Sequence, residues 1–130
     1  RDSTPELARD LLGSEAIIGG TVNSLREAEN LLSKGVCDYA GVGPFRSTCT
    51  KVNLAPILSA EELREILDTL SEIPSFVIGG LRSKDVREVL SLGAHGLAVC
   101  GTLFATGKSV SQNVSCVLAE LNLVCSGLAA

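Results

Sequence analysis

Two threonines and a lysine lie close together just after a short apolar segment. The segment at residues 38–42 breaks at Gly43-Pro44, and the loop that follows presents Thr48, Thr50 and Lys51. The threonines offer two hydroxyl donors, and the lysine offers a point positive charge on the same short loop. This combination predicts a loop that binds an anionic ligand.

Glycine pairs follow other apolar segments of the chain. Gly19-Gly20 precedes Thr21, Gly79-Gly80 follows residues 75–78, and Val99-Cys100 is followed by a glycine. Glycine lets backbone N–H groups approach a ligand, and a helix that starts nearby attracts anions. In parallel α/β proteins such turns meet at the carboxyl ends of the strands. They predict a phosphate site, although a glycine pair can also simply end a strand.

The other polar candidates are predicted to be structural. Asp38 stands at the beginning of its strand, where a capping role or an ion pair is expected. His95, the single histidine, precedes the strand at 96–100 and so lies at the end opposite the expected site. Cys100 has no neighbouring His or Lys to lower its pKa, so a backbone N–H contact is expected rather than a nucleophile.

Short apolar segments alternate with amphipathic helical ones, which predicts an α/β fold with a parallel sheet in one domain, 1–130. Helices are expected from Thr4-Pro5 and after the capping residues Ser24, Ser59, Ser83 and Ser109. The predicted strands lie near 16–19, 38–42, 75–79 and 96–100.

An internal repeat supports this organisation. Ile18-Gly19-Gly20, with glycines at 35 and 43, is matched by Ile78-Gly79-Gly80, with glycines at 93 and 101. Such repeats are common in (β/α)₈ barrels, and four strand–helix units make half of one. The chain also contains no methionine. We therefore expect the C-terminal half of a TIM barrel whose N-terminal half is missing.

Composition narrows the possible partners. Net charge is −4, aromatic residues make up 3% of the chain, and no run of Lys or Arg occurs, so nucleic acid is not expected to bind. No apolar run reaches membrane-spanning length, so no membrane association is expected. Five cysteines without a Cys-x-x-Cys pair predict free thiols in a reducing, cytoplasmic compartment.

Over about its first 105 residues, the chain resembles the thiamine-phosphate synthase (thiamine-phosphate pyrophosphorylase) family. The resemblance is carried by Asp38-Tyr39, Gly43-Pro44, Thr48-x-Thr50-Lys51, Ile78-Gly79-Gly80 and residues 96–101. The spelling Gly-Pro-Phe-Arg-x-Thr-x-Thr-Lys, followed by Asn53-Leu54-x-Pro56-Ile57-Leu58, is most similar to a bacteroidete-like branch.

The resemblance implies a (β/α)₈ barrel that joins hydroxymethylpyrimidine diphosphate to thiazole phosphate, with Mg²⁺, and releases diphosphate. Lys51 would be catalytic and would hold the pyrimidine's diphosphate together with Thr21. The thiazole phosphate would be bound by Thr48, Thr50, Gly79, Gly80, Val99 and Cys100, the last four through backbone N–H groups. Asp2 would be the one metal ligand in this chain.

Two positions depart from the family pattern. Cys100 stands where the family usually has serine, which a backbone contact tolerates. Asn23 stands where relatives often have histidine, the residue on which the thiazole tautomerases rely. Three alternatives stay open: a tautomerase-like relative, a non-catalytic phosphate-binding half-barrel that forms a homodimer, and another phosphate-binding barrel enzyme.

Overall fold

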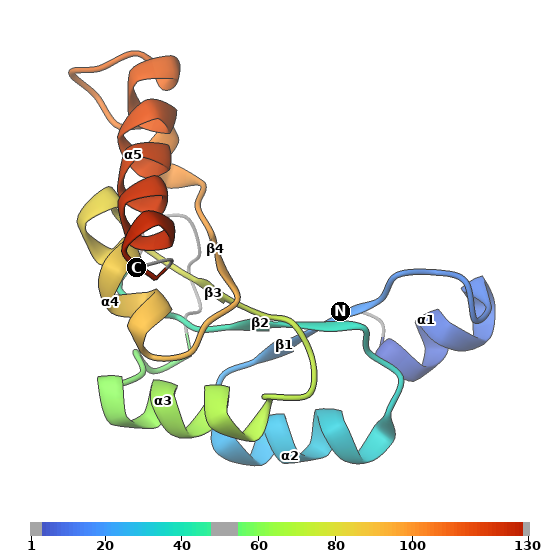
Figure 1. The fold of residues 1–130 in the computed structure, drawn as a ribbon. Helices are drawn as coiled ribbons and strands as arrows, with labels where there is room; N and C mark the ends of the chain where they lie inside the picture. Colours follow the sequence, from blue (N-terminus) through green and yellow to red (C-terminus); the bar gives the residue numbers. More distant parts are fainter. Residues whose placement is uncertain (1–3, 48–54, 129–130) are drawn as a thin grey trace.

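Four parallel strands form a single sheet in the computed structural model, which describes residues 4–47 and 55–128. The strands are β1 (Gly19–Val22), β2 (Tyr39–Val42), β3 (Ser75–Ile78) and β4 (Gly96–Ala98). They lie in chain order, β1-β2-β3-β4, and each is joined to the next by a segment containing a helix (Figure 1). The predicted α/β class and parallel sheet are confirmed.

All but one of the described helices begin where local capping signals place them. The helices are α1 (Pro5–Leu12), α2 (Leu25–Lys34), α3 (Ala60–Thr69), α4 (Val86–Ser91) and α5 (Val110–Leu128). At α3, Ser59 Oγ accepts from the Glu62 N–H at 3.2 Å, and the Glu62 carboxylate accepts from the Ser59 N–H at 2.8 Å. Two otherwise unpaired donors are satisfied reciprocally, which fixes the first turn. No helix in the described part of the chain is long and apolar enough to cross a membrane.

The core lies between the sheet and the helices beneath it. Alternate strand residues Val22, Ala40, Val42 and Val77 are fully buried on that face. Helices α2 and α3 cover it side by side, and Leu63 of α3 is also fully buried (Figure 1). These contacts fix the positions of the strands, and therefore of the loops at their carboxyl ends.

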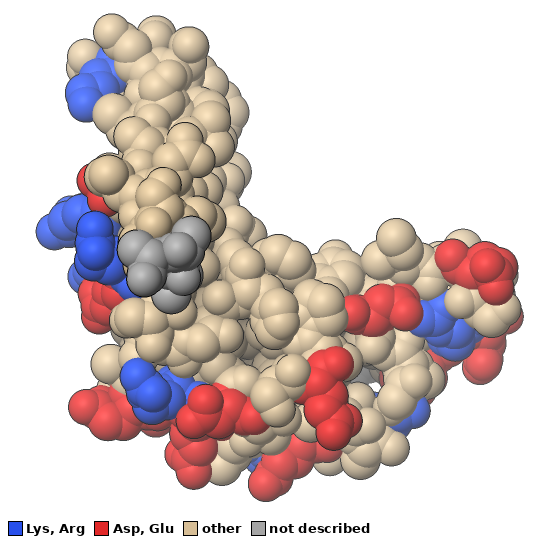
Figure 2. Space-filling view, in the orientation of Figure 1, with Lys and Arg blue, Asp and Glu red and all other residues tan. Residues whose placement is uncertain are grey.

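The opposite face of the sheet is open. Tyr39 is 40% exposed and Ile78 is 45% exposed, and the ring of Phe76 meets that of Tyr39 edge to face at 6.1 Å. Charged residues gather along the helical side of the molecule, whereas the hollow between α5 and α1 is almost free of charge (Figure 2). The uncovered face is therefore apolar and carries few charged side chains.

The first strand lies later than its predicted range of 16–19. The prediction placed a strand end at Gly19-Gly20, but these glycines open β1 and pair with Tyr39 and Ala40 of β2. A Cβ on Gly19 would overlap the Tyr39 ring, and one on Gly20 would overlap Leu31. The glycines are needed because side chains from other elements pack directly on the strand. The other three strands fall within their predicted ranges.

Ser83 does not cap a helix, contrary to the prediction. It is the first residue of a 3₁₀ turn, Ser83–Asp85, which leads into α4. The Asp85 carboxylate accepts from the Arg82 N–H at 2.9 Å and so closes the 3₁₀ turn, whereas α4 itself begins without a side-chain cap.

Candidate functional site

The glycine turn after β3 has a backbone that only glycine adopts readily. Gly79 has φ +103° and Gly80 has φ +62°, both in the left-handed region. The turn follows Ile78, which pairs with Ala98 of β4. Val99 and Cys100 come directly after Ala98, so the structure places the two predicted phosphate-binding turns on neighbouring strands.

Among the described residues, the backbone donors of these turns make no loop hydrogen bond. Within residues 4–47 and 55–128, no loop hydrogen bond is donated by the amides of Gly79-Gly80 or Val99-Cys100. Cys100 is exposed and precedes the 3₁₀ turn Gly101–Phe104. The Thr102 hydroxyl donates to the carbonyl of Leu81, which ties this turn to the segment after β3. Backbone N–H groups in turns of this kind can bind an anion.

The loop after β2 packs tightly on the Gly79-Gly80 turn. Phe45 N–H donates to the Ile78 carbonyl at 3.1 Å, and Arg46 N–H donates to the Gly79 carbonyl at 3.0 Å. A Cβ on Gly80 would lie 2.8 Å from both Arg46 Cβ and the Ser47 carbonyl oxygen. Glycine at these positions is therefore needed for the packing of the two loops, in addition to its predicted role in binding.

An ion pair that the sequence did not reveal links the same two loops. Arg46 Nε lies 3.0 Å from Asp85 Oδ2, and Arg46 Nη2 lies 2.7 Å from Asp85 Oδ1. Asp85 is 1% exposed. Although burial alone would raise the pKa of Asp85, the hydrogen bonds from Arg46 and from the Arg82 N–H lower it overall. The two residues are 39 positions apart, and the only signal in the sequence is an arginine directly after Gly43-Pro44-Phe45.

Thr21 lies apart from the glycine turns. It is exposed on the open face of β1, opposite Gly41, and β1 is separated from β3 by β2. It shares the uncovered side of the sheet with Tyr39 and Ile78. Thr48, Thr50, Lys51 and Asp2, the other predicted ligand-binding residues, lie outside the described residues.

Asp38 and His95 have the structural surroundings predicted for them. The Ile18 N–H donates to Asp38 Oδ2 at 2.7 Å, and Arg9 Nη2 lies 2.8 Å from the same oxygen. His95 Nδ1 accepts from the Ser75 N–H at 3.3 Å, where β3 begins. Both residues lie at the amino ends of the strands, opposite the glycine turns.

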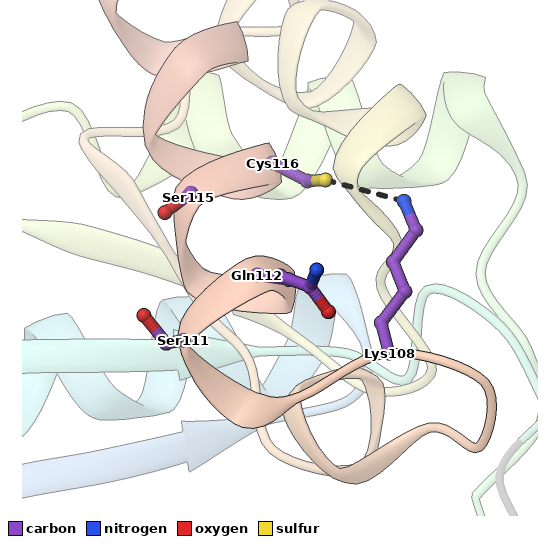
Figure 3. Close-up of a pocket in the computed structure, with 5 residues that line it drawn as sticks. All are labelled: Lys108, Ser111, Gln112, Ser115 and Cys116. Carbon is purple, nitrogen blue, oxygen red and sulfur yellow. Dashed lines mark hydrogen bonds between the residues drawn. The ribbon is translucent and has the colours of Figure 1, made fainter.

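A shallow hollow also lies on the first turns of α5. It is lined by Lys108, Ser111, Gln112, Ser115 and Cys116, and has a volume of about 270 Å³. Lys108 reaches across it, with Nζ 3.5 Å from Cys116 Sγ (Figure 3). None of the predicted ligand-binding residues lines this hollow.

The described residues do not assemble a metal site. Among residues 4–47 and 55–128, no three His, Cys, Asp or Glu side chains lie together as ligands of one metal ion would. The described cysteines 37, 100, 116 and 125 are free thiols. The structure therefore gives no cluster that fits Mg²⁺ within its described part.

The sheet order and the turns after β3 and β4 define a parallel β/α protein whose candidate ligand loops meet at one end of the sheet. The family model for thiamine monophosphate synthase matches residues 1–103, and the chain belongs to that family. Thiamine-phosphate synthase of Flavobacterium johnsoniae is 43% identical over 100 residues, which are 74% of this chain and 47% of that protein. The enzyme of Bacteroides thetaiotaomicron is 39% identical over 107 residues, covering 79% and 51% respectively.

A solved structure agrees with this family assignment. Thiamine phosphate pyrophosphorylase from Pyrococcus furiosus superposes with a TM-score of 0.80 at 31% identity, over 95% of this chain and 56% of that one. The chain thus spans about half the length of the curated relatives it matches. The recognised resemblance to this family, including the bacteroidete relatives, is confirmed.

Proposed function

We propose that this chain supplies one side of a thiamine-phosphate synthase active site. The reaction joins hydroxymethylpyrimidine diphosphate to thiazole phosphate and releases diphosphate. The observation that carries the proposal is the pairing of the Gly79-Gly80 turn with Val99-Cys100 at neighbouring strand ends. Backbone N–H groups there would donate to the phosphate of the thiazole.

The remaining roles fall to residues of the loop after β2 and of β1. Thr48 and Thr50 would donate hydroxyl hydrogens to the thiazole phosphate. Lys51 and Thr21 would hold the diphosphate of the pyrimidine. As the bond to the diphosphate breaks, negative charge grows on the leaving oxygens, and the ammonium of Lys51 would stabilise it. No protein nucleophile is required.

Magnesium belongs to the proposal as a cofactor that would neutralise diphosphate charge when bound. Asp2 is the one ligand proposed from this chain. Because the described residues hold no metal-binding cluster, no step of the reaction is assigned to the ion here.

We also propose that the open face of the sheet is covered by four further β/α units, which complete a (β/α)₈ barrel. Supporting this, the apolar face carries exposed Tyr39 and Ile78, and Ile17 beside β1 is 82% exposed. Leu11 and Leu12 of α1 are 75% and 66% exposed. Several large exposed apolar side chains on one domain favour an interaction site. The partner would be the N-terminal half of the same barrel, in the cytoplasm.

A homodimeric, non-catalytic half-barrel is the second candidate, because a second copy could also cover the apolar face and the free strand edges. A tautomerase-like activity is less well supported. The side-chain amide of Asn23 donates to the Gly43 carbonyl, so this residue ties the ends of β1 and β2 together.

A complementation experiment tests the proposal. The chain is mixed with the segment of the Flavobacterium johnsoniae synthase that it does not match, and thiamine phosphate formation is assayed with both substrates and Mg²⁺. We expect activity in the mixture, loss of that activity with Lys51→Ala, and no loss with the control Lys108→Ala. A hetero-complex that forms in sedimentation but makes no product contradicts the synthase proposal, and a stable homodimer with no activity favours the second candidate.

A further inference from the structure

We propose that Arg46 and Asp85 form a positioning pair for the candidate phosphate site. Their ion pair holds the loop after β2 against the Gly79-Gly80 turn and so keeps the backbone N–H groups of that turn in place for an anion. The ligand in this inference rests on the proposed function, whereas the positioning itself rests on the contacts within the chain.

Asp85 is held from two directions. Arg46 donates to it through two parallel N–H groups, at 3.0 and 2.7 Å, and the Arg82 backbone N–H donates at 2.9 Å. This fork geometry allows little rotation of either side chain. Because Asp85 is 1% exposed, its carboxylate has no alternative partner in bulk water. The charge of Asp85 thus fixes where the Arg46 side chain lies.

Arg46 transmits that constraint to the glycine turn. Its own N–H donates to the Gly79 carbonyl at 3.0 Å, and its guanidinium lies over the Phe45 ring, 5.0 Å from the centroid. The close approach of Gly80 to Arg46 leaves no space between the two loops. A shift of Arg46 must therefore move the Gly79-Gly80 backbone, or break its hydrogen bond to Gly79.

Stability alone is a weak reason for such a pair. Desolvation of the buried Asp85 carboxylate offsets much of the Coulomb energy of the pair, and water screens the attraction at Arg46, whose side chain is 40% exposed. The pair instead lies where two loops of the candidate site must keep a fixed relation, and Thr48 follows Arg46 by two positions. Fixing that relation before a ligand arrives reduces the ordering that binding would otherwise require.

The test uses the ¹⁵N-labelled chain, with Arg46→Gln and Asp85→Asn as variants and Arg9→Gln as the matched control. Arg9 also makes a side-chain network with a carboxylate, Asp38, but at the amino ends of the strands. NMR spectra report the Gly79 and Gly80 amide shifts without ligand. Titration with inorganic phosphate then gives an affinity.

We expect all three variants to lower the unfolding midpoint. Only Arg46→Gln and Asp85→Asn should move the Gly79 and Gly80 amide signals, and these two should weaken phosphate binding at least about fivefold, on the order of the loss of one hydrogen bond. Arg46→Lys keeps the charge without the fork, so it should fold and give an intermediate effect.

Two outcomes separate the claims. Arg46→Gln is compared with the control Arg9→Gln, and Arg46→Lys takes its place if Arg46→Gln does not fold. If the Arg46 variant changes the glycine signals and the phosphate affinity no more than the control does, the pair is structural only and the inference is wrong. If the wild-type chain binds no phosphate but the glycine signals still move in the Arg46 and Asp85 variants alone, the positioning role holds. In that case the phosphate site of the proposed function fails.

Discussion

The guanidinium of Arg9, on α1, lies 2.8 Å from the carboxylate of Asp38, immediately before β2. The same guanidinium donates to four backbone carbonyls, those of Gly13, Ser14, Ala16 and Val36. One side chain thus joins α1, the segment leading to β1 and the segment leading to β2. The prediction that Asp38 has a structural role is explained by this network.

Arg9→Ala should lower the thermal unfolding midpoint by about 5 °C or more, because several carbonyl groups lose their donor at once. Arg26→Ala is the control, since Arg26 is exposed on α2 and should leave the midpoint within about 1 °C of the wild type. Differential scanning calorimetry of the three proteins checks this. Equal midpoints for Arg9→Ala and the control would mean that the network contributes nothing to folding.

The stabilising effect of Asp38 should depend on pH in one direction. The Ile18 N–H, and after it the Arg9 guanidinium, lower the pKa of Asp38 below its ordinary 3.8. A carboxyl group whose folded pKa is lowered stabilises the fold above its unfolded pKa, and this contribution is lost as the pH falls through the folded pKa. Urea unfolding should therefore show that wild type has a larger free energy of unfolding than Asp38→Asn, by an amount that is constant near neutral pH. This difference should disappear below about pH 3.8. A difference that widens on acidification would contradict this.

Local features of the sequence were sufficient to predict much of the fold. Capping serines such as Ser59 act over three or four residues, so the starts of α3 and α5 could be read directly. The parallel sheet followed from short apolar strands, and the Gly79-Gly80 turn followed from its position after one of them. Each of these predictions depended on a pattern within a short segment of the chain.

Contacts between distant residues could not be predicted in this way. Gly19 and Gly20 were interpreted as a strand end, but they lie inside β1 because Tyr39 and Leu31 pack where their side chains would be. Asp85 was not singled out, because its partner Arg46 belongs to a different loop. The expected roles of Thr48, Thr50, Lys51 and Asp2 stay predictions, since those residues lie outside the described part of the chain.

Gly43→Ala should destabilise the chain by about 1–3 kcal/mol, because a Cβ there would overlap the backbone carbonyl of Ile78 on β3. Backbone cannot rotate away as a flexible side chain can. Gly127→Ala, in α5, is the control because nothing lies within 4 Å of its Cβ position. Urea denaturation should show a clear loss for the first variant and no loss for the second. A neutral Gly43→Ala would show that β2 and β3 can separate without cost.

The thiols should differ in reactivity according to burial. Burial, and after it the negative charges of Glu6 and Asp38, raise the pKa of Cys37, so less of its thiolate is available. Cys100 and Cys125 are exposed. Limited alkylation with iodoacetamide, followed by peptide mass spectrometry, should therefore label these two before Cys37. Faster labelling of Cys37 would indicate that the segment before β2 opens readily.

Inorganic phosphate should protect Cys100 from alkylation while leaving Cys125 unaffected. Cys100 directly follows β4, beside the Gly79-Gly80 turn, so an anion held by the backbone N–H groups there would restrict access of iodoacetamide to its thiol. Cys125, near the end of α5, has no part in the proposed site and controls for effects of phosphate on the reagent. Equal slowing of both thiols would point to such a reagent effect, and an unchanged rate at Cys100 would place the anion elsewhere.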